Sequence, residues 1–187
     1  MGSRLLLAAS LVLAPGACTQ ETGPSSDSEA GNLVPNGSFE RDGQATLETW
    51  QVANPSLATL TPQTPPGGGR WSLRLAADGA PSTGQVRCPI PGLRDGDGVH
   101  LSAYVQSSGE NGGGLVGLEI TSPDGRIRWQ SFTSSEAAQW TQVGVTERLS
   151  LQAGDGLWVV LKSPPTQLES RAGLFDLVRL EKLPPPS

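Results

Sequence analysis

Clusters of Gly, Pro, Asn and Asp interrupt this chain at short intervals, and the runs between them alternate apolar with polar residues. The 187 residues include 24 Gly and 16 Pro. No segment keeps apolar residues at the spacing of a helical face. Short alternating runs bounded by turn residues are typical of an all-β protein. The predicted strands are 34–39, 50–52, 57–60, 70–76, 84–90, 99–106, 115–121, 127–132, 141–151, 157–162 and 174–181.

The N-terminal residues differ from this strand-rich region. In residues 1–17, Arg4 precedes an apolar run that is far shorter than the roughly 20 residues of a membrane-spanning helix. Small residues then lead to Cys18, a pattern that resembles a bacterial lipoprotein signal peptide with Cys18 as the lipidated residue. Ordinary cleavage after Ala17, which would leave Cys18 unmodified, is the alternative.

The rest of the chain divides into three parts. Residues 18–31 carry no aromatic or branched aliphatic residue and are predicted to form a disordered tether. Residues 32–183 form the predicted folded domain, and 184–187 a short tail. A lipid on Cys18 predicts a membrane-anchored protein of the cell envelope, at the outer membrane or cell surface. The formal net charge of −5 argues against a nucleic-acid partner.

The chain has two cysteines, Cys18 and Cys88, and a structural disulfide would need both. Cys88 alternates in phase with Val86 and Ile90. It is therefore predicted to be a small buried apolar residue, which leaves Cys18 for the lipid.

Several motifs occur in an order that resembles a known family. They are NLVPNGSFE at 32–40, Trp50, GGGRWSLRL at 67–75, GVHLSAYVQ at 98–106, QWTQV at 139–143 and GLFDLVRLEKL at 173–183. Together they are similar to carbohydrate-binding modules of the galactose-binding-domain-like group, which holds families four, nine and twenty-two. The resemblance spans residues 32–183 and implies a jelly-roll β-sandwich of two antiparallel sheets.

The resemblance also implies a structural calcium ion where the first and last strands meet. Its ligands would be the side chains of Glu40 and Asp176 and the backbone carbonyls of Ser38 and of Gly69 or Arg70. The chemistry agrees, because calcium prefers oxygen ligands and Asp176 lies in an apolar run where a charge needs a partner. The alternative is a carboxylate that is capped by backbone N–H groups or paired with Arg70. The family often has a second aspartate where this chain has Leu177.

Sugars are bound by exposed aromatic rings together with hydrogen-bonding and charged groups. Alternation along the predicted strands leaves such residues on the faces that point away from the core. The predicted glycan-binding residues are Trp158, Trp129, Tyr104, His100, Gln106, Glu119 and Lys162. Trp129 is included because the resemblance implies a sugar-contacting aromatic residue near its position. They converge if these faces belong to one concave sheet. For Trp129, the alternative is a core position with Arg128 or Gln130 exposed instead, and Trp50, Trp71 and Trp140 are predicted to be core residues.

No catalytic motif accompanies these residues. The chain has a single histidine and lacks the G-x-S-x-G, H-E-x-x-H and phosphate-loop patterns. The sequence thus predicts a non-catalytic glycan-binding domain displayed on a membrane-anchored lipoprotein. The alternative is a structural or protein-interaction lipoprotein that uses the same sandwich without sugar.

Overall fold

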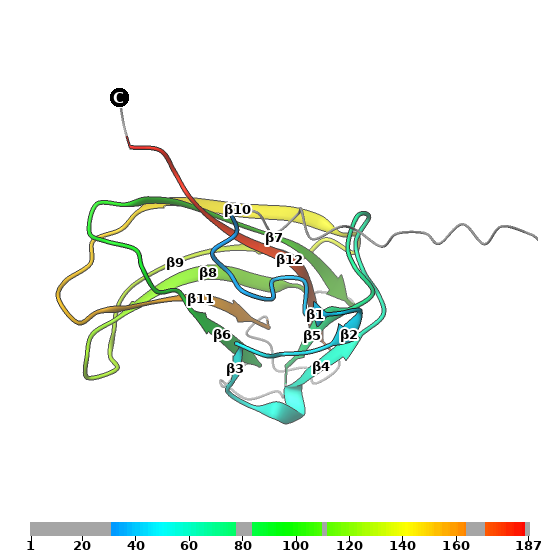
Figure 1. Ribbon diagram of the computed structural model, residues 1–187. Coiled ribbons are helices and arrows are strands. Elements are labelled where there is room, and N and C mark those ends of the chain that lie inside the picture. The colour runs from blue at the N-terminus through cyan, green and yellow to red at the C-terminus, as the bar shows by residue number, and fades with distance from the viewer. Residues whose placement is uncertain (1–30, 78–83, 110–111, 164–170, 186–187) are drawn as a thin grey trace, which may run out of the picture.

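The computed structural model describes residues 31–77, 84–109, 112–163 and 171–185 and places most of them in strands. Two five-stranded antiparallel sheets stack on each other (Figure 1). Each is named here after its central strand. The β11 sheet has the order β3 (Gln51–Val52), β6 (Gln85–Pro89), β11 (Gly156–Lys162), β8 (Gly114–Thr121) and β9 (Ile127–Ser135). The β12 sheet has the order β10 (Thr141–Arg148), β7 (Gly98–Ser108), β12 (Ala172–Lys182), β5 (Ser72–Ala76) and β4 (Ala58–Thr61).

The remaining elements are short. β1 (Glu40–Arg41) pairs with β2 (Gln44–Ala45), and a 3₁₀ turn covers Pro55–Leu57. The expected all-β sandwich of two antiparallel sheets is confirmed. The predicted signal peptide, Cys18 and almost all of the predicted tether lie outside the described residues. Within the described ranges, no helix has the length and apolar character needed to cross a membrane.

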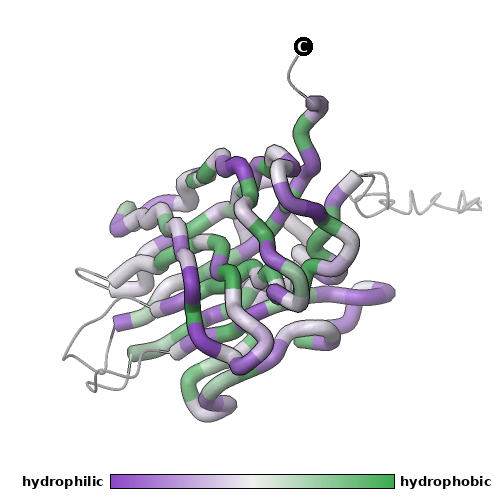
Figure 2. Tube along the Cα trace, turned by 90° about the vertical axis from the view of Figure 1, so that its left-hand side faces the viewer, coloured by the Kyte–Doolittle hydropathy of each residue, from purple (hydrophilic) through white to green (hydrophobic). Residues whose placement is uncertain are grey.

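Alternation along the strands builds the core as predicted. In β7, Val99, Leu101, Ala103 and Val105 are all fully buried. The hydropathy of the tube in Figure 2 changes from residue to residue along the strands in the same way. Cys88 is also fully buried and has a free thiol, and its burial raises the pKa of that thiol.

The tryptophans are distributed differently from the prediction. Trp50 is a core residue, with its ring 5.4 Å from that of Phe39. Trp71 and Trp140 are only half-buried. Of the three tryptophans that were predicted to be core residues, only Trp50 is buried.

The predicted first strand, 34–39, is wrong. Asn36 and Phe39 have φ values of 58° and 56°, in the left-handed region that an extended strand does not use. The segment nevertheless joins β12, because the Leu33 amide donates to the Leu180 carbonyl at 2.8 Å and the Val178 amide to the Gly37 carbonyl at 2.9 Å. Residues 32–39 thus run along β12 as a loop rather than as a strand, and we call them the opening arm.

Candidate functional site

The predicted glycan-binding residues lie on both sheets. Trp158, Lys162, Glu119 and Trp129 belong to the β11 sheet, whereas Tyr104, His100 and Gln106 belong to β7 of the β12 sheet. The outer faces of two stacked sheets point away from each other. The expectation that all seven residues converge on one sheet is therefore wrong. Alternation fixes the side of a strand on which a residue lies, but it carries no information on which sheet that strand joins.

Trp129 faces the core side rather than the outer face. It lies opposite Ile120, which is 1% exposed, and it packs against the core cluster. A register shift in the β8–β9 pairing, between Ile120 and Thr121, changes the phase of the alternation there. The exposed neighbour is Gln130, which lies opposite Glu119. The prediction that Trp129 is an exposed sugar-stacking residue is therefore wrong, and the alternative is correct.

On the outer face of the β11 sheet, two aromatic rings lie over glycines. A Cβ on Gly117 would be 2.2 Å from Cδ1 of Phe132, and a Cβ on Gly156 would be 3.2 Å from Nε1 of Trp158. The Trp158 Nε1–H also donates to Oγ1 of Thr121 at 3.0 Å. Because these glycines have no side chains, each ring can lie against the sheet.

Charged groups surround both rings. The Lys162 Nζ donates to Oε1 of Glu119 at 2.6 Å and lies 4.3 Å from the centre of the Phe132 ring. The Arg87 guanidinium lies 4.2 Å from the centre of the Trp158 ring. Glu119 is 1% exposed, so this carboxylate depends on Lys162 for its charge partner. We call Trp158, Phe132, Arg87, Glu119 and Lys162 the aromatic face.

Two members of the aromatic face were not predicted. Arg87 alternates with the buried Val86 and Cys88, which was a sufficient signal for its outward direction. Phe132 lies opposite Gly117 on the neighbouring strand, and only the strand pairing reveals this.

The three predicted residues on β7 have separate environments. Nδ1 of His100 lies 2.9 Å from Oγ1 of Thr146. The amide group of Gln106 accepts from Gln63 and donates to the Ala138 carbonyl, at 2.9 and 2.8 Å. Tyr104 lines a pocket on this face.

The predicted metal ligands meet where the opening arm reaches β12. Asp176 is fully buried; its Oδ1 accepts from the Leu177 amide at 2.7 Å, and its Oδ2 has no hydrogen-bond partner. Burial raises the pKa of Asp176 to about 7, and the nearby charge of Glu40 adds to this effect. An unpartnered buried carboxylate oxygen is the feature that a bound cation would satisfy.

Two consecutive glycines cover these carboxylates. A Cβ on Gly68 would be 2.7 Å from Oδ2 of Asp176, and a Cβ on Gly69 would be 2.0 Å from Oε1 of Glu40. The Arg70 amide donates to Oε2 of Glu40 at 2.7 Å. Of the two sequence alternatives, the backbone cap is present on one Asp176 oxygen, and no ion pair joins Arg70 to Asp176 in the part of the chain that the structure describes.

The donor set fits a hard cation. Two carboxylates and backbone oxygens are what calcium accepts, and the buried Oδ2 of Asp176 lacks any other partner. Within the described ranges, no three His, Cys, Asp or Glu side chains gather as a metal site. A cation here would therefore need main-chain oxygens, such as the predicted carbonyls of Ser38 and of Gly69 or Arg70.

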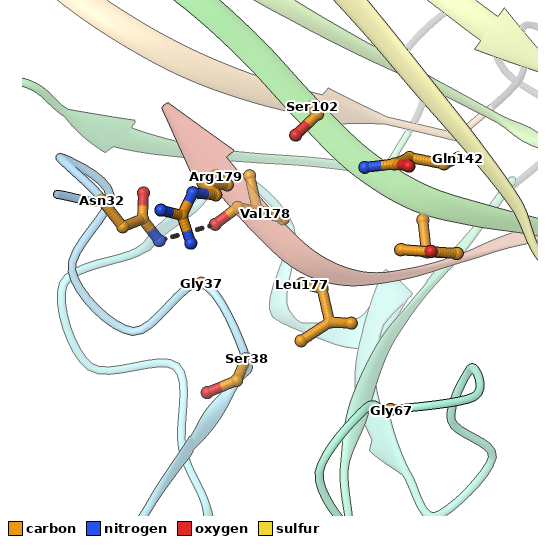
Figure 3. A pocket seen from close by; sticks show the side chains of 10 residues that line it. Asn32, Gly37, Ser38, Gly67, Ser102, Gln142, Leu177, Val178 and Arg179 are labelled. Carbon is orange, nitrogen blue, oxygen red and sulfur yellow. Dashed lines mark hydrogen bonds between the residues drawn. The ribbon is translucent and has the colours of Figure 1, made fainter. Parts of the chain in front are cut away.

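Beside this junction lies a pocket of about 220 Å³ (Figure 3). It is bordered by the opening arm, the loop at Gly67, the strands β7 and β10, and β12 at its bulge. Ser102 and Gln142 lie on one side of the pocket and Ser38 on the other, with Leu177 between them.

This two-sheet architecture is the β-sandwich of carbohydrate-binding modules. A family 16 carbohydrate-binding module superposes with a TM-score of 0.56 at 17% identity, over 80% of this chain and 99% of that one. The second xylan-binding family 22 module of Xyn10C from Paenibacillus barcinonensis gives a TM-score of 0.57 at 17% identity, over 78% of this chain and 96% of that one. At these identities, the similarity concerns the fold.

The enzymatically active domain of tailspike protein 4 from bacteriophage CBA120 also contains this fold. It matches with a TM-score of 0.61 at 12% identity, over 82% of this chain. The match spans only 22% of the length of the tailspike chain. No model of a known protein family matches the sequence, and no curated protein matches it.

Proposed function

We propose that this protein is a non-catalytic glycan-binding domain and that the aromatic face is its binding surface. The observation that carries the proposal is the pair of rings over Gly117 and Gly156, with the Glu119–Lys162 pair beside them. Rings that lie against a sheet can stack on the C–H faces of a sugar, while the polar groups between them reach its hydroxyls. The fold shared with carbohydrate-binding modules, one of them described as xylan-binding, supports this role.

A Trp158→Ala variant is expected to weaken glycan binding at least tenfold, because the substitution removes one of the two rings. The measurement is affinity electrophoresis of the whole protein through gels that contain soluble polysaccharides, xylan and galactan among them. Trp71→Ala is the matched control, since Trp71 directly precedes β5 of the opposite sheet. If no polysaccharide in a broad panel retards the wild-type protein, the structural or protein-interaction role replaces this one.

We propose further that calcium binds at the junction through Glu40, Asp176 and neighbouring backbone oxygens. When bound, the ion would link the opening arm to β12. The unpartnered Oδ2 of Asp176 and the glycines that cover both carboxylates support this site.

Calcium at a concentration of 100 times its dissociation constant is expected to stabilise the fold by about 2.7 kcal/mol. The melting temperature should therefore rise by roughly 5–10 °C on addition of calcium, and a chelator should reverse the rise. In Asp176→Asn, the side chain keeps its size but loses its charge, so the response to calcium should disappear. If neither calcium nor a chelator changes the melting temperature of the wild-type protein, the proposal is contradicted.

Display on a membrane is also a proposal. It rests on the sequence of residues 1–18, in which an apolar run and then small residues lead to Cys18, the predicted lipidation site. Such an anchor would hold the sandwich at the cell envelope through the tether 18–31.

A further inference from the structure

The pocket on the outer face of the β12 sheet contains polar groups that the fold leaves unused. Ser102 is only 7% exposed, and its hydroxyl makes no hydrogen bond with any described residue. Tyr104 is half-buried and Gln142 is exposed, and both line the same pocket. The hydroxyl of Tyr104 and the amide group of Gln142 also make no hydrogen bond with a described residue. Three hydrogen-bonding groups without a protein partner in the described ranges therefore line one hollow, where a ligand can reach them.

A bulge in β12 creates this hollow. β12 pairs with β7 at Asp176–Tyr104 and again at Arg179–Ser102, so two residues of β12 face one of β7. Leu177 lies in this bulge with φ at 49°, a backbone conformation that leucine rarely adopts. Its side chain lies toward the pocket, between Ser38 and Gln142 (Figure 3). The pocket therefore combines one apolar surface with a set of hydrogen-bonding groups.

We propose that this pocket binds a single neutral sugar ring, separately from the aromatic face. Hydroxyl and amide groups can both donate and accept, which suits the hydroxyls of a sugar. The cation at the pocket, Arg179, already pairs with Glu181 at 2.8 Å, so a charged ligand would have to compete for it. At about 220 Å³, the pocket is smaller than the roughly 300–1,000 Å³ of sites for larger ligands. One ring fits this volume better than a chain of them.

The site lies away from the aromatic face. Ser102, Tyr104 and Gln142 belong to β7 and β10, whereas Trp158 and Phe132 belong to β11 and β9 of the other sheet. The two proposals can therefore fail independently.

The test is a titration of the isotope-labelled whole protein with the methyl β-glycosides of glucose, galactose, xylose and mannose, followed by NMR. At least one of them should shift the backbone amide signals of Ser102, Tyr104 and Leu177 saturably. Tyr104→Phe, which keeps the ring, and Gln142→Ala should each weaken that binding by about fivefold, because each removes hydrogen-bonding groups.

Two control variants separate the sites. His100 lies on the same strand, β7, but outside the pocket. The His100→Ala variant should therefore bind the glycosides as the wild-type protein does. Trp158→Ala should also leave the shifts at Ser102 and Leu177 intact. The proposal is overturned if none of the four glycosides shifts these signals, or if Tyr104→Phe and Gln142→Ala bind unchanged. Shifts confined to the aromatic face would overturn it while leaving the proposed function standing.

Discussion

Replacing Gly37 with alanine is expected to lower the free energy of unfolding by about 3 kcal/mol. A Cβ at this position would lie 2.0 Å from the carbonyl oxygen of Val178. This oxygen belongs to the backbone, so no change of side-chain rotamer can relieve the clash. The Gly37 carbonyl also accepts the Val178 amide hydrogen bond. The added methyl group would therefore push the opening arm off β12. For a domain of this size, the melting temperature should fall by roughly 6–12 °C, as measured by circular dichroism or calorimetry.

Gly67→Ala is the matched control for this variant. Gly67 has no atom within 4 Å of its Cβ position, and its φ is 78°. Alanine there carries only a backbone cost of roughly 1–2 kcal/mol. Gly37 has no such φ, so a loss at Gly37 no larger than that at Gly67 would mean that the contact with Val178 costs less than expected.

The second large effect is expected at the buried ion pair. Lys162→Met should destabilise the protein by about 3 kcal/mol, because it leaves Glu119 charged and buried without its partner. This is the lower end of the usual range for a broken buried pair, since the Lys162 side chain is 20% exposed. The measurement is chemical denaturation of the whole protein.

The double variant Glu119→Gln with Lys162→Met tests the cause. It removes both charges, so it should recover most of the stability that Lys162→Met loses. If the double variant is as unstable as the single one, loss of the contact between the Lys162 ammonium group and the Phe132 ring is the cause instead.

The fold could be predicted largely because alternation is a local signal. Ten of the predicted strands overlap observed ones. The exception, 34–39, has the composition of a strand but takes left-handed conformations at Asn36 and Phe39. Long-range hydrogen bonds to β12 accompany that shape, and no window of sequence contains them.

The candidate site was only partly predictable for the same reason. The outward direction of Trp158, Glu119 and Lys162 follows from alternation and is correct. Which strands become neighbours does not follow from it, so residues of two opposite faces were joined into one surface. Trp129 was predicted from the resemblance, because its neighbours leave its face open, and a one-residue bulge in this hairpin changes the phase of the strand there. Only the cross-strand register shows that Phe132 lies beside Gly117.

The position of β12 has a consequence for how the protein reaches its native state. This strand lies in the middle of its sheet, between β7 and β5, yet the ribosome makes it after every other strand of both sheets. Until it emerges, the β4–β5 pair and the β7–β10 pair have no partner edge to join, and the opening arm has no strand to pair with. Completion of this sheet must therefore wait until β12 has been synthesised, and a nascent chain would keep two unpaired edges open to chaperones in the meantime.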